Sequence, residues 1–362
     1  MANEASLALL KQRYLEDPKD LERALDLVRR FNSLGRCGDA LRLCRAAMKN
    51  HSGEYDFLLE FANVLYKNGD FKESRMIYRK LTDINPERVE AWNNLGILEL
   101  SKGNLEEANA AFGKVLELNP DSVGALCNIG NYFAEKGDAA VGATYFERAI
   151  EVEPEFPDAW YNLGNAYMSL NQFKDARDAL EKAIKYDKSF GSAYKNLGFV
   201  YEQLENYDKA LDCYRKAAAL NKSDAGVQVN MAGIYMRLDK YDKALDCGKR
   251  AASLAPGEQS SWNALRTAAI RTGDGETYYR AVNALISGIS NWDLARSIAD
   301  LREMGFDTEA EELLEYTVKI NKGSKSVDAL PFTESRPPQI ATGGAGHKTY
   351  KIINKKREPA IV

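Results

Sequence analysis

Residues 89–122 decide the fold, and they read VEAWNNLGILELSKGNLEEANAAFGKVLELNPDS. The first half of this stretch places apolar or small residues at helical spacing: Trp92, Leu95, Gly96 and Leu98. The second half carries another such stripe: Ala108, Phe112 and Val115. The stretch therefore predicts two short amphipathic helices.

Breaks in the pattern predict where these helices end. Lys102-Gly103-Asn104 interrupts the first helix, because Gly103 adopts a positive φ without steric cost. Asn119-Pro120 stops the second helix, because proline cannot continue it. Gly96 and Ala108 are small enough to let the two helices approach closely, with Phe112 filling the space beside them. We therefore expect a tightly packed helix pair.

The same pattern recurs along the chain every 34 residues. Prolines, glycines and alanines follow this period: Pro86, Pro120 and Pro154; Gly96, Gly130, Gly164 and Gly198; Ala108, Ala176, Ala210 and Ala244, with Gly142 as the gap. Counting Trp92 as position 4 gives units that begin at residues 21, 55, 89, 123, 157, 191 and 225. A fixed period of this length is typical of repeat proteins, whose units stack because none buries its apolar face alone.

The repeat resembles the tetratricopeptide repeat (TPR) family, which has a large apolar residue at position 4, Leu at 7, Gly at 8, Tyr at 11 and Ala at 20 and 27. Two units carry this pattern: Trp160, Leu163, Gly164, Tyr167, Ala176 and Ala183 in 157–190, and Tyr194, Leu197, Gly198, Tyr201, Ala210 and Ala217 in 191–224. The resemblance implies an all-α fold, a right-handed superhelical solenoid of tandem helix-turn-helix units. It also implies that the first helices line a concave groove.

The period divides the chain into segments. We expect an N-terminal capping helix in 1–20, seven 34-residue units in 21–258, a degenerate unit in 259–290, a last unit in 291–324 and a flexible basic tail in 325–362. The unit 259–290 is degenerate because Tyr278 stands where the pattern has Ala.

Asparagines recur at positions that face the groove in this family. Position 6 is Asn94, Asn128, Asn162, Asn196 and Asn230 in five consecutive units, and position 9 adds Asn131 and Asn165. A primary amide donates and accepts hydrogen bonds, so each side chain can pair with a peptide backbone amide. The pattern resembles the asparagine ladder in the repeats of O-linked N-acetylglucosamine transferase. The alternative is that these asparagines support helix packing or recur by repeat duplication.

Charged and apolar residues share the predicted groove. Its acids are Asp56, Glu60, Glu90, Glu135, Asp158 and Glu202, and its bases are Lys67, Lys195 and Arg237. Tyr161 lies beside the asparagines. The acidic excess favours an extended peptide of neutral to basic charge, while a merely solvated face is the alternative.

The favoured function is a non-catalytic scaffold or adaptor that binds one or more proteins or peptides in the groove. The alternatives are a targeting or substrate-recognition subunit of a separately encoded enzyme, and a self-assembling structural array. Some members of the family bind the C-termini of Hsp70 and Hsp90 through a set of lysines and asparagines called a clamp. This chain lacks that clamp, because Cys127 and Ser192 stand at two of its lysine positions.

Composition narrows these classes further. The chain has 362 residues and a net charge of −4, and this negative charge disfavours nucleic-acid binding. It has two histidines, which disfavours a multi-histidine metal centre. No cofactor is expected. No apolar run is long enough for a signal or for membrane insertion, and the five cysteines include no CxxC, so we expect a cytoplasmic protein. Residues 322–362 carry a net +5, leaving −9 elsewhere. This basic C-terminal tail is a plain flexible end, a motif for a second partner contact, or a segment that docks on the acidic groove.

Overall fold

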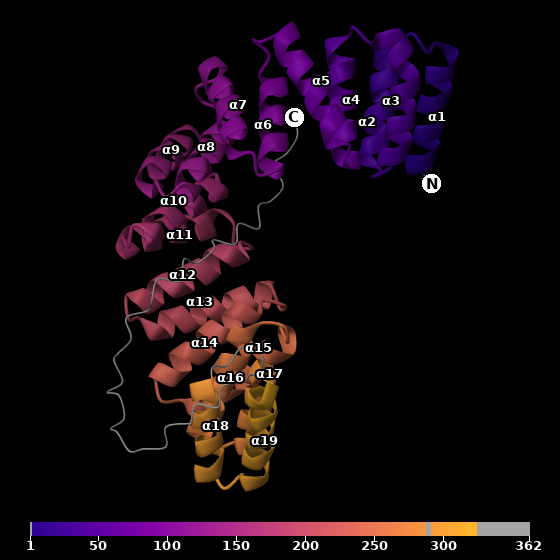
Figure 1. The fold of residues 1–362 in the computed structure, drawn as a ribbon. Coiled ribbons are helices and arrows are strands. Elements are labelled where there is room, and N and C mark those ends of the chain that lie inside the picture. Colours follow the sequence, from indigo (N-terminus) through magenta and orange to yellow (C-terminus); the bar gives the residue numbers. More distant parts are fainter. Residues whose placement is uncertain (1, 287–290, 324–362) are drawn as a thin grey trace. The chain divides into compact units, whose positions relative to one another are not determined.

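The computed structural model describes residues 2–286 and 291–323. Every regular element in these two ranges is a helix, and the ranges hold nineteen of them (Figure 1). The predicted all-α fold is confirmed. The predicted basic tail, residues 325–362, lies outside the described residues. The described chain forms two compact units, one ending at Leu170 and the other beginning at Asn171.

The first unit contains ten helices. They are α1 (Ala2–Glu16), α2 (Leu21–Ser33), α3 (Cys37–His51), α4 (Tyr55–Asn68), α5 (Phe71–Ile84), α6 (Val89–Ser101), α7 (Leu105–Leu118), α8 (Val123–Glu135), α9 (Ala139–Val152) and α10 (Pro157–Ser169).

The second unit contains the remaining nine. They are α11 (Phe173–Tyr186), α12 (Gly191–Gln203), α13 (Tyr207–Leu220), α14 (Ala225–Arg237), α15 (Tyr241–Leu254), α16 (Gln259–Thr272), α17 (Gly275–Leu285), α18 (Asn291–Glu303) and α19 (Asp307–Gly323).

Within each unit, each helix packs against its neighbours along the chain, which builds a solenoid. The even-numbered helices, here called first helices, begin every 34 residues from residue 21 to residue 259. First helices of successive repeats also contact one another, α4 with α6 and α8 with α10 in the first unit, and α12 with α14 in the second. Side chains on the first helices therefore form a shared face within each unit.

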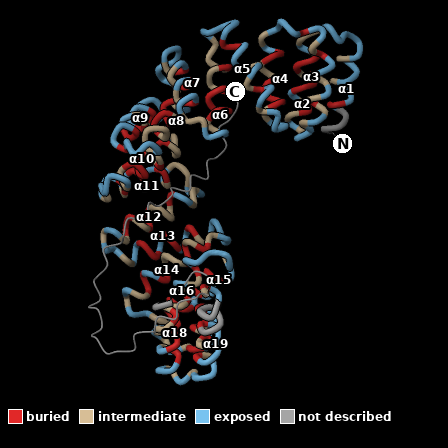
Figure 2. The backbone as a smooth tube through the Cα atoms, viewed as in Figure 1, coloured by how far each residue is buried: buried red, intermediate tan, exposed pale blue. Residues whose placement is uncertain are grey.

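The core lies between the helices as a thin layer, seen as the buried segments in Figure 2. A Cβ atom added at Gly96 would lie 2.7 Å from Phe112 Cε1, so the predicted close approach is confirmed. A Cβ added at Gly142 would lie 2.7 Å from the Gly130 carbonyl oxygen. Glycine replaces the usual alanine at 142 because the helices are too close there for a methyl group.

The turns inside the repeats need a left-handed residue. Gly103 has φ = +77°, as the pattern predicts. Three turns reach the same conformation without glycine, at Asn171 (φ = +57°), Glu205 (φ = +58°) and Asp239 (φ = +55°). A side chain at positive φ is strained, and more so for Glu than for Asn or Asp.

The degenerate repeat buries its unusual tyrosine and gives the hydroxyl hydrogen-bond partners. Tyr278 on α17 is only 2% exposed. Its hydroxyl donates to Asp300 Oδ2 at 2.8 Å and lies 3.2 Å from Ser297 Oγ, both on α18. Burial raises the pKa of the Tyr278 hydroxyl to about 12. This large side chain therefore joins α17 to α18.

Candidate functional site

The predicted groove residues lie on the first helices, and their burial separates them into two groups. Asn94 on α6 is only 1% exposed, and its Nδ2 donates to Asn63 Oδ1 at 3.0 Å. The hydroxyl of Tyr78 donates to the same oxygen at 2.6 Å. Asn94, predicted to bind a ligand, is therefore buried, and its amide is already paired with Asn63 at position 9 of the preceding repeat.

Two further predicted groove residues are buried. Asn165 is 7% exposed and Tyr161 is 8% exposed, both on α10. Each takes part in an interaction within the chain. These two side chains, predicted to line the groove, are therefore largely covered by the stacked repeats.

Three asparagines of the first unit keep an available amide. Asn128 and Asn131 on α8 and Asn162 on the contacting helix α10 are half-buried. None of the three makes a side-chain hydrogen bond to the described residues. Position 9 before Asn128 is Ile97, which has no acceptor to offer. We call Asn128, Asn131 and Asn162 the asparagine face.

The second unit carries two of the predicted asparagines. Asn196 on α12 and Asn230 on α14 are half-buried, and these two helices contact each other. Asn196 already interacts within the chain. The second unit therefore contributes a shorter series of amides than the pattern predicts.

The acid Glu90 is neutralised by a residue that the sequence reasoning missed. Arg88 donates to Asp56 Oδ1 at 2.7 Å and to Glu90 Oε1 at 3.0 Å, and its guanidinium lies 4.1 Å from the Tyr55 ring centroid. These hydrogen bonds from Arg88 lower the pKa of the Glu90 carboxyl. The sequence contained a signal for this ion pair. Arg88 immediately precedes α6, and acids stand at position 2 of its own repeat and of the next one, Asp56 and Glu90. Arg88 thus offsets one of the two negative charges that Asp56 and Glu90 bring to the predicted groove.

Ion pairs also neutralise predicted groove charges in the second unit. Glu202 is 14% exposed at its side chain, lies 3.5 Å from Arg237, and accepts from the Tyr214 hydroxyl at 3.3 Å. Burial raises the pKa of the Glu202 carboxyl, and this effect is larger than the lowering caused by the positive charge of Arg237. Lys195 pairs with Asp224 at 2.9 Å, a second partner that the sequence reasoning missed.

Asp158 remains close to the asparagine face. It is half-buried on α10, and its charge reaches Cys127 on α8. Burial, with a smaller contribution from Asp158, raises the pKa of the Cys127 thiol to about 12. Cys127 is only 7% exposed and stays a protonated packing residue. The carboxylates of Asp158 and Glu153 both act on Cys127, and Asp158 itself takes part in an interaction within the chain.

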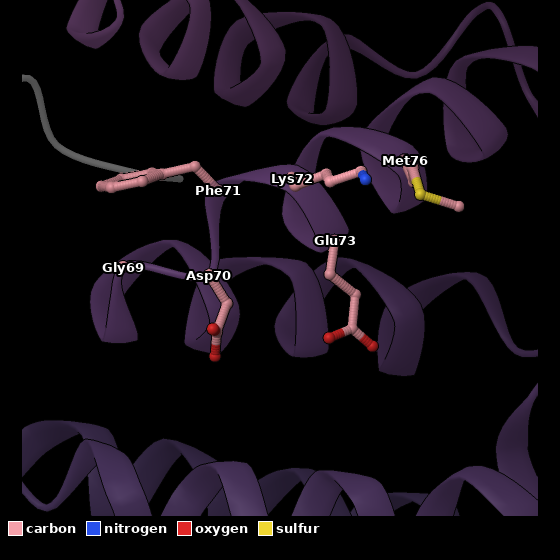
Figure 3. Close-up of a pocket in the computed structure, with 6 residues that line it drawn as sticks. All are labelled: Gly69, Asp70, Phe71, Lys72, Glu73 and Met76. Atoms are coloured by element: carbon pink, nitrogen blue, oxygen red, sulfur yellow. The ribbon is translucent and has the colours of Figure 1, made fainter.

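A surface pocket lies elsewhere in the first unit, at the turn between α4 and α5 (Figure 3). Its lining residues are Gly69, Asp70, Phe71, Lys72, Glu73 and Met76. All of them except Phe71 are exposed, so the pocket is shallow. Lys102 Nζ covers the Phe71 ring at 3.3 Å from its centroid. None of the predicted groove residues lines this pocket.

Two chemical features are absent from the described residues. Residues 2–286 and 291–323 contain no group of three or more His, Cys, Asp or Glu side chains placed to hold a metal ion. Across that part of the chain, no helix combines the length and the apolar character that crossing a membrane requires.

The repeated helix pairs place this chain among the α-solenoids. Comparisons with known families identify the family of α-solenoids to which it belongs. Models described as tetratricopeptide repeat match residues 25–87, 59–123 and 123–156. The model of the tetratricopeptide repeat protein 21 C-terminal ARM domain matches residues 143–258. Together the matches run without a gap from residue 25 to residue 258, and the chain belongs to the tetratricopeptide repeat family. No curated protein sequence matches the chain.

Two solved structures agree with this chain on the fold. The APC/C hetero-tetramer Cut9-Hcn1 matches with a TM-score of 0.56 at 17% identity, over 74% of this chain and 52% of that one. A tetratricopeptide repeat protein from Parabacteroides merdae ATCC 43184 matches with a TM-score of 0.53 at 16% identity, over 68% and 98%. MamA is 25% identical with a TM-score of 0.42, over 45% and 95%. The family is a protein-interaction fold, which makes the chain a scaffold for protein or peptide partners.

Proposed function

We propose that the chain is a non-catalytic adaptor that binds an extended peptide segment of a partner protein on the asparagine face. The observation that supports this most is the set of three half-buried amides, Asn128, Asn131 and Asn162, whose hydrogen-bonding groups have no partner among the described residues. Half-buried amides form stronger hydrogen bonds than fully solvated ones, because the surrounding dielectric is lower. They recur on contacting helices, as a regular peptide backbone would require.

Backbone recognition explains why asparagine serves here. Its Oδ1 accepts from a peptide N–H while its Nδ2 donates to a peptide C=O. Such pairs hold the main chain and leave side-chain preference to the residues around them. Asp158 and Glu153 lie close enough to Cys127 to act on its thiol, and these acidic surroundings favour a peptide that is neutral to basic. With Glu90 already bound to Arg88, we expect a weaker preference for basic peptides than the acidic residues in the sequence indicate.

The test uses the full chain and an array of twelve-residue peptides with net charges from −2 to +4. The strongest binders are resynthesised with fluorescein, and their Kd is measured by fluorescence polarisation. The triple variant Asn128→Ala, Asn131→Ala, Asn162→Ala should weaken binding at least tenfold, since each lost hydrogen bond contributes about 0.5–1.5 kcal/mol. The double variant Asn85→Ala, Asn263→Ala, at two exposed asparagines elsewhere, is the control and should bind normally.

A second arm tests backbone recognition directly. Peptides carrying N-methyl groups at successive amides lose the N–H donor and keep the side chain. Methylation at alternate positions should abolish binding to the wild-type chain and change little for the triple variant. Equal Kd values for the triple variant and the wild type, or no effect of methylation, would refute this function.

A reducing compartment such as the cytoplasm fits the thiols. All five cysteines are free, and four of them are buried. Free buried thiols persist where the surroundings are reducing. We include a cytoplasmic location in the proposal on this ground.

A further inference from the structure

Residues of different chemistry stand on the two sides of the asparagine face, toward opposite ends of its helices. On α10, Asp158 is the second residue and Met168 is the last but one, with Asn162 between them. At a rise of about 1.5 Å per residue, Asp158 and Met168 lie about 15 Å apart along the helix axis. The amides of the asparagine face therefore lie on a strip with a different border on each side.

The acidic border consists of Glu153 and Asp158. Glu153 is exposed and immediately follows α9, and Asp158 is half-buried on α10. Both carboxylates act on the thiol of Cys127, the residue before Asn128 on α8. The acidic border is therefore close to α8 as well as to α10. Asp158 already takes part in an interaction within the chain, whereas Glu153 makes no side-chain hydrogen bond or ion pair with the described residues.

The apolar border consists of Ala134 on α8 and Met168 on α10. They occupy position 12 of successive repeats, and both are half-buried. Ala134 follows Asn131 by three residues, which places both side chains on one face of α8. The polar residues that come next are engaged, since Ser169 Oγ donates to a carbonyl of its own helix at 3.1 Å and Glu135 interacts within the chain. The flexible thioether of Met168 adapts to apolar side chains of different shapes.

An extended peptide presents its main chain and its side chains at right angles to each other. The N–H and C=O groups of one residue point to the same side, and those of the next residue point to the opposite side. Successive side chains alternate in the perpendicular direction. When N–H and C=O groups point toward the asparagine face, the side chains therefore point alternately toward its two borders. A layer of extended chain with its side chains is about 10 Å deep, so the strip of about 15 Å accommodates it.

We propose that the asparagine face selects an extended peptide in which apolar and basic residues alternate. The apolar side chains lie on Ala134 and Met168, and the basic side chains lie toward Glu153 and Asp158. This inference rests on the peptide binding proposed above and adds the sequence pattern of the ligand. A peptide without the alternation binds through its main chain alone and is therefore held less tightly.

The equivalent helices of the second unit lack this arrangement. Position 12 is the acid Glu202 on α12, and it is Met236 on α14. Position 2, which is acidic on α10, is Ser192 on α12 and Gly226 on α14. The two borders therefore distinguish the asparagine face from its counterpart in the second unit. Met236 is half-buried like Met168 and provides a matched control for it.

Peptides of equal composition test the pattern. One peptide alternates Leu and Lys over eight residues, and the other places the same four Leu before the same four Lys. Both carry fluorescein, and their Kd for the full chain is measured by fluorescence polarisation. The alternating peptide should bind at least tenfold more tightly than the block peptide. Equal Kd values for the two peptides would overturn the proposal.

Substitutions at the borders identify the side chains that read the pattern. The double variant Ala134→Asn, Met168→Gln should weaken binding of the alternating peptide at least fivefold and that of the block peptide less than twofold. Met236→Gln should change neither Kd. The exposed change Glu153→Lys should weaken the alternating Leu-Lys peptide and strengthen a peptide that alternates Leu and Glu. A double variant that keeps the full preference for the alternating order would overturn the proposal.

Backbone methylation gives an independent readout. Residues whose N–H groups point toward the face all direct their side chains to the same border. N-methylation should therefore weaken binding at residues of one kind only, either at the Leu or at the Lys positions, and equal losses at both kinds would contradict the proposal. If the triple asparagine variant loses binding while residue order makes no difference, this inference fails and the proposed function stands. If the triple variant binds as the wild type does, the proposed function itself fails.

Discussion

Glu99 and Arg75 form an ion pair between adjacent repeats, with Glu99 on α6 and Arg75 on α5. The carboxylate of Glu99 is only 1% exposed. It also accepts from Asn104 Nδ2 at 2.7 Å and lies 3.7 Å from Arg79. A buried carboxylate held by donors from two repeats fixes the position of one repeat against the next.

The contact between Glu99 and Arg79 recurs at the equivalent positions of other repeats, with other residue types. Glu99 is at position 11 of its repeat and Arg79 at position 25 of the preceding one. The equivalent pairs are Tyr167 with Glu147 at 2.9 Å, Tyr201 with Glu181 at 2.5 Å, and Tyr235 with Arg215 at 3.2 Å. The site therefore accepts either a carboxylate or a phenol at position 11, provided that the partner is complementary.

The first prediction follows from this pair. Glu99→Ala should lower the free energy of unfolding by about 2–3 kcal/mol, because it leaves Arg75 and Asn104 without an acceptor. Glu99→Tyr should recover part of the loss, since Arg215 already pairs with a tyrosine at the equivalent place. Urea denaturation measures the change, and hydrogen exchange of α5 and α6 locates it. Glu73→Ala, which breaks the exposed pair with Arg45, is the control and should cost less than about 1 kcal/mol. A Glu99→Ala chain as stable as wild type would contradict the prediction.

The second prediction separates structural from binding asparagines. Asn63→Ala should cost about 2–3 kcal/mol, because the Tyr78 hydroxyl and the Asn94 amide both lose their acceptor inside the core. Asn128→Ala should change stability by less than about 0.5 kcal/mol, since its amide has no partner among the described residues. Urea midpoints of the two variants give the comparison. Similar midpoints for both would show that burial does not divide these asparagines as the hydrogen bonds indicate.

The third prediction concerns the strained turn at Glu205. Glu205→Gly should stabilise the chain by roughly 0.5–1 kcal/mol, because glycine removes the strain at φ = +58° but adds entropy to the unfolded chain. The reciprocal change Gly103→Glu, at φ = +77°, should destabilise it by about 1–2 kcal/mol. Both turns close with the same backbone hydrogen bonds, Asn206 N–H to Tyr201 O and Asn104 N–H to Glu99 O. Thermal unfolding measures both variants, and a lower Tm for Glu205→Gly would contradict the argument.

The fourth prediction uses the raised pKa of Glu202. A carboxyl whose pKa is higher in the folded state binds its proton more tightly there than in the unfolded chain. Its stabilising contribution is complete below the unfolded pKa of about 4.3 and is lost as the pH rises through the folded pKa. Glu202→Gln mimics the protonated form, so it should be more stable than wild type at pH 7 and equal to it at pH 4. Urea midpoints between pH 4 and pH 8 test this, and a wild-type advantage at pH 7 would show that the pair with Arg237 dominates.

The sequence predicted the helical class, the close approach at Gly96 and the turn at Gly103, because each rests on residues near one another in the chain. It also placed the candidate asparagines on the first helices. It did not predict that Asn94, Asn165 and Tyr161 are buried, or that Arg88 neutralises Glu90. The burial of the first three side chains depends on how the repeats stack, whereas Arg88 is only two residues from Glu90, so that pair was recognisable from the sequence.

The 34-residue period by itself determined what kind of protein this is, since apolar spacing, small residues and turn residues act locally and repeat in every unit. The period also makes every asparagine at position 6 look alike. Only the tertiary structure decided which of them has a free amide, because this depends on how the side chains of neighbouring repeats pack. Asn63 takes the amide of Asn94 into the core. Asn162 makes no side-chain hydrogen bond to the described residues, although Asn131 precedes it at the same position of the repeat.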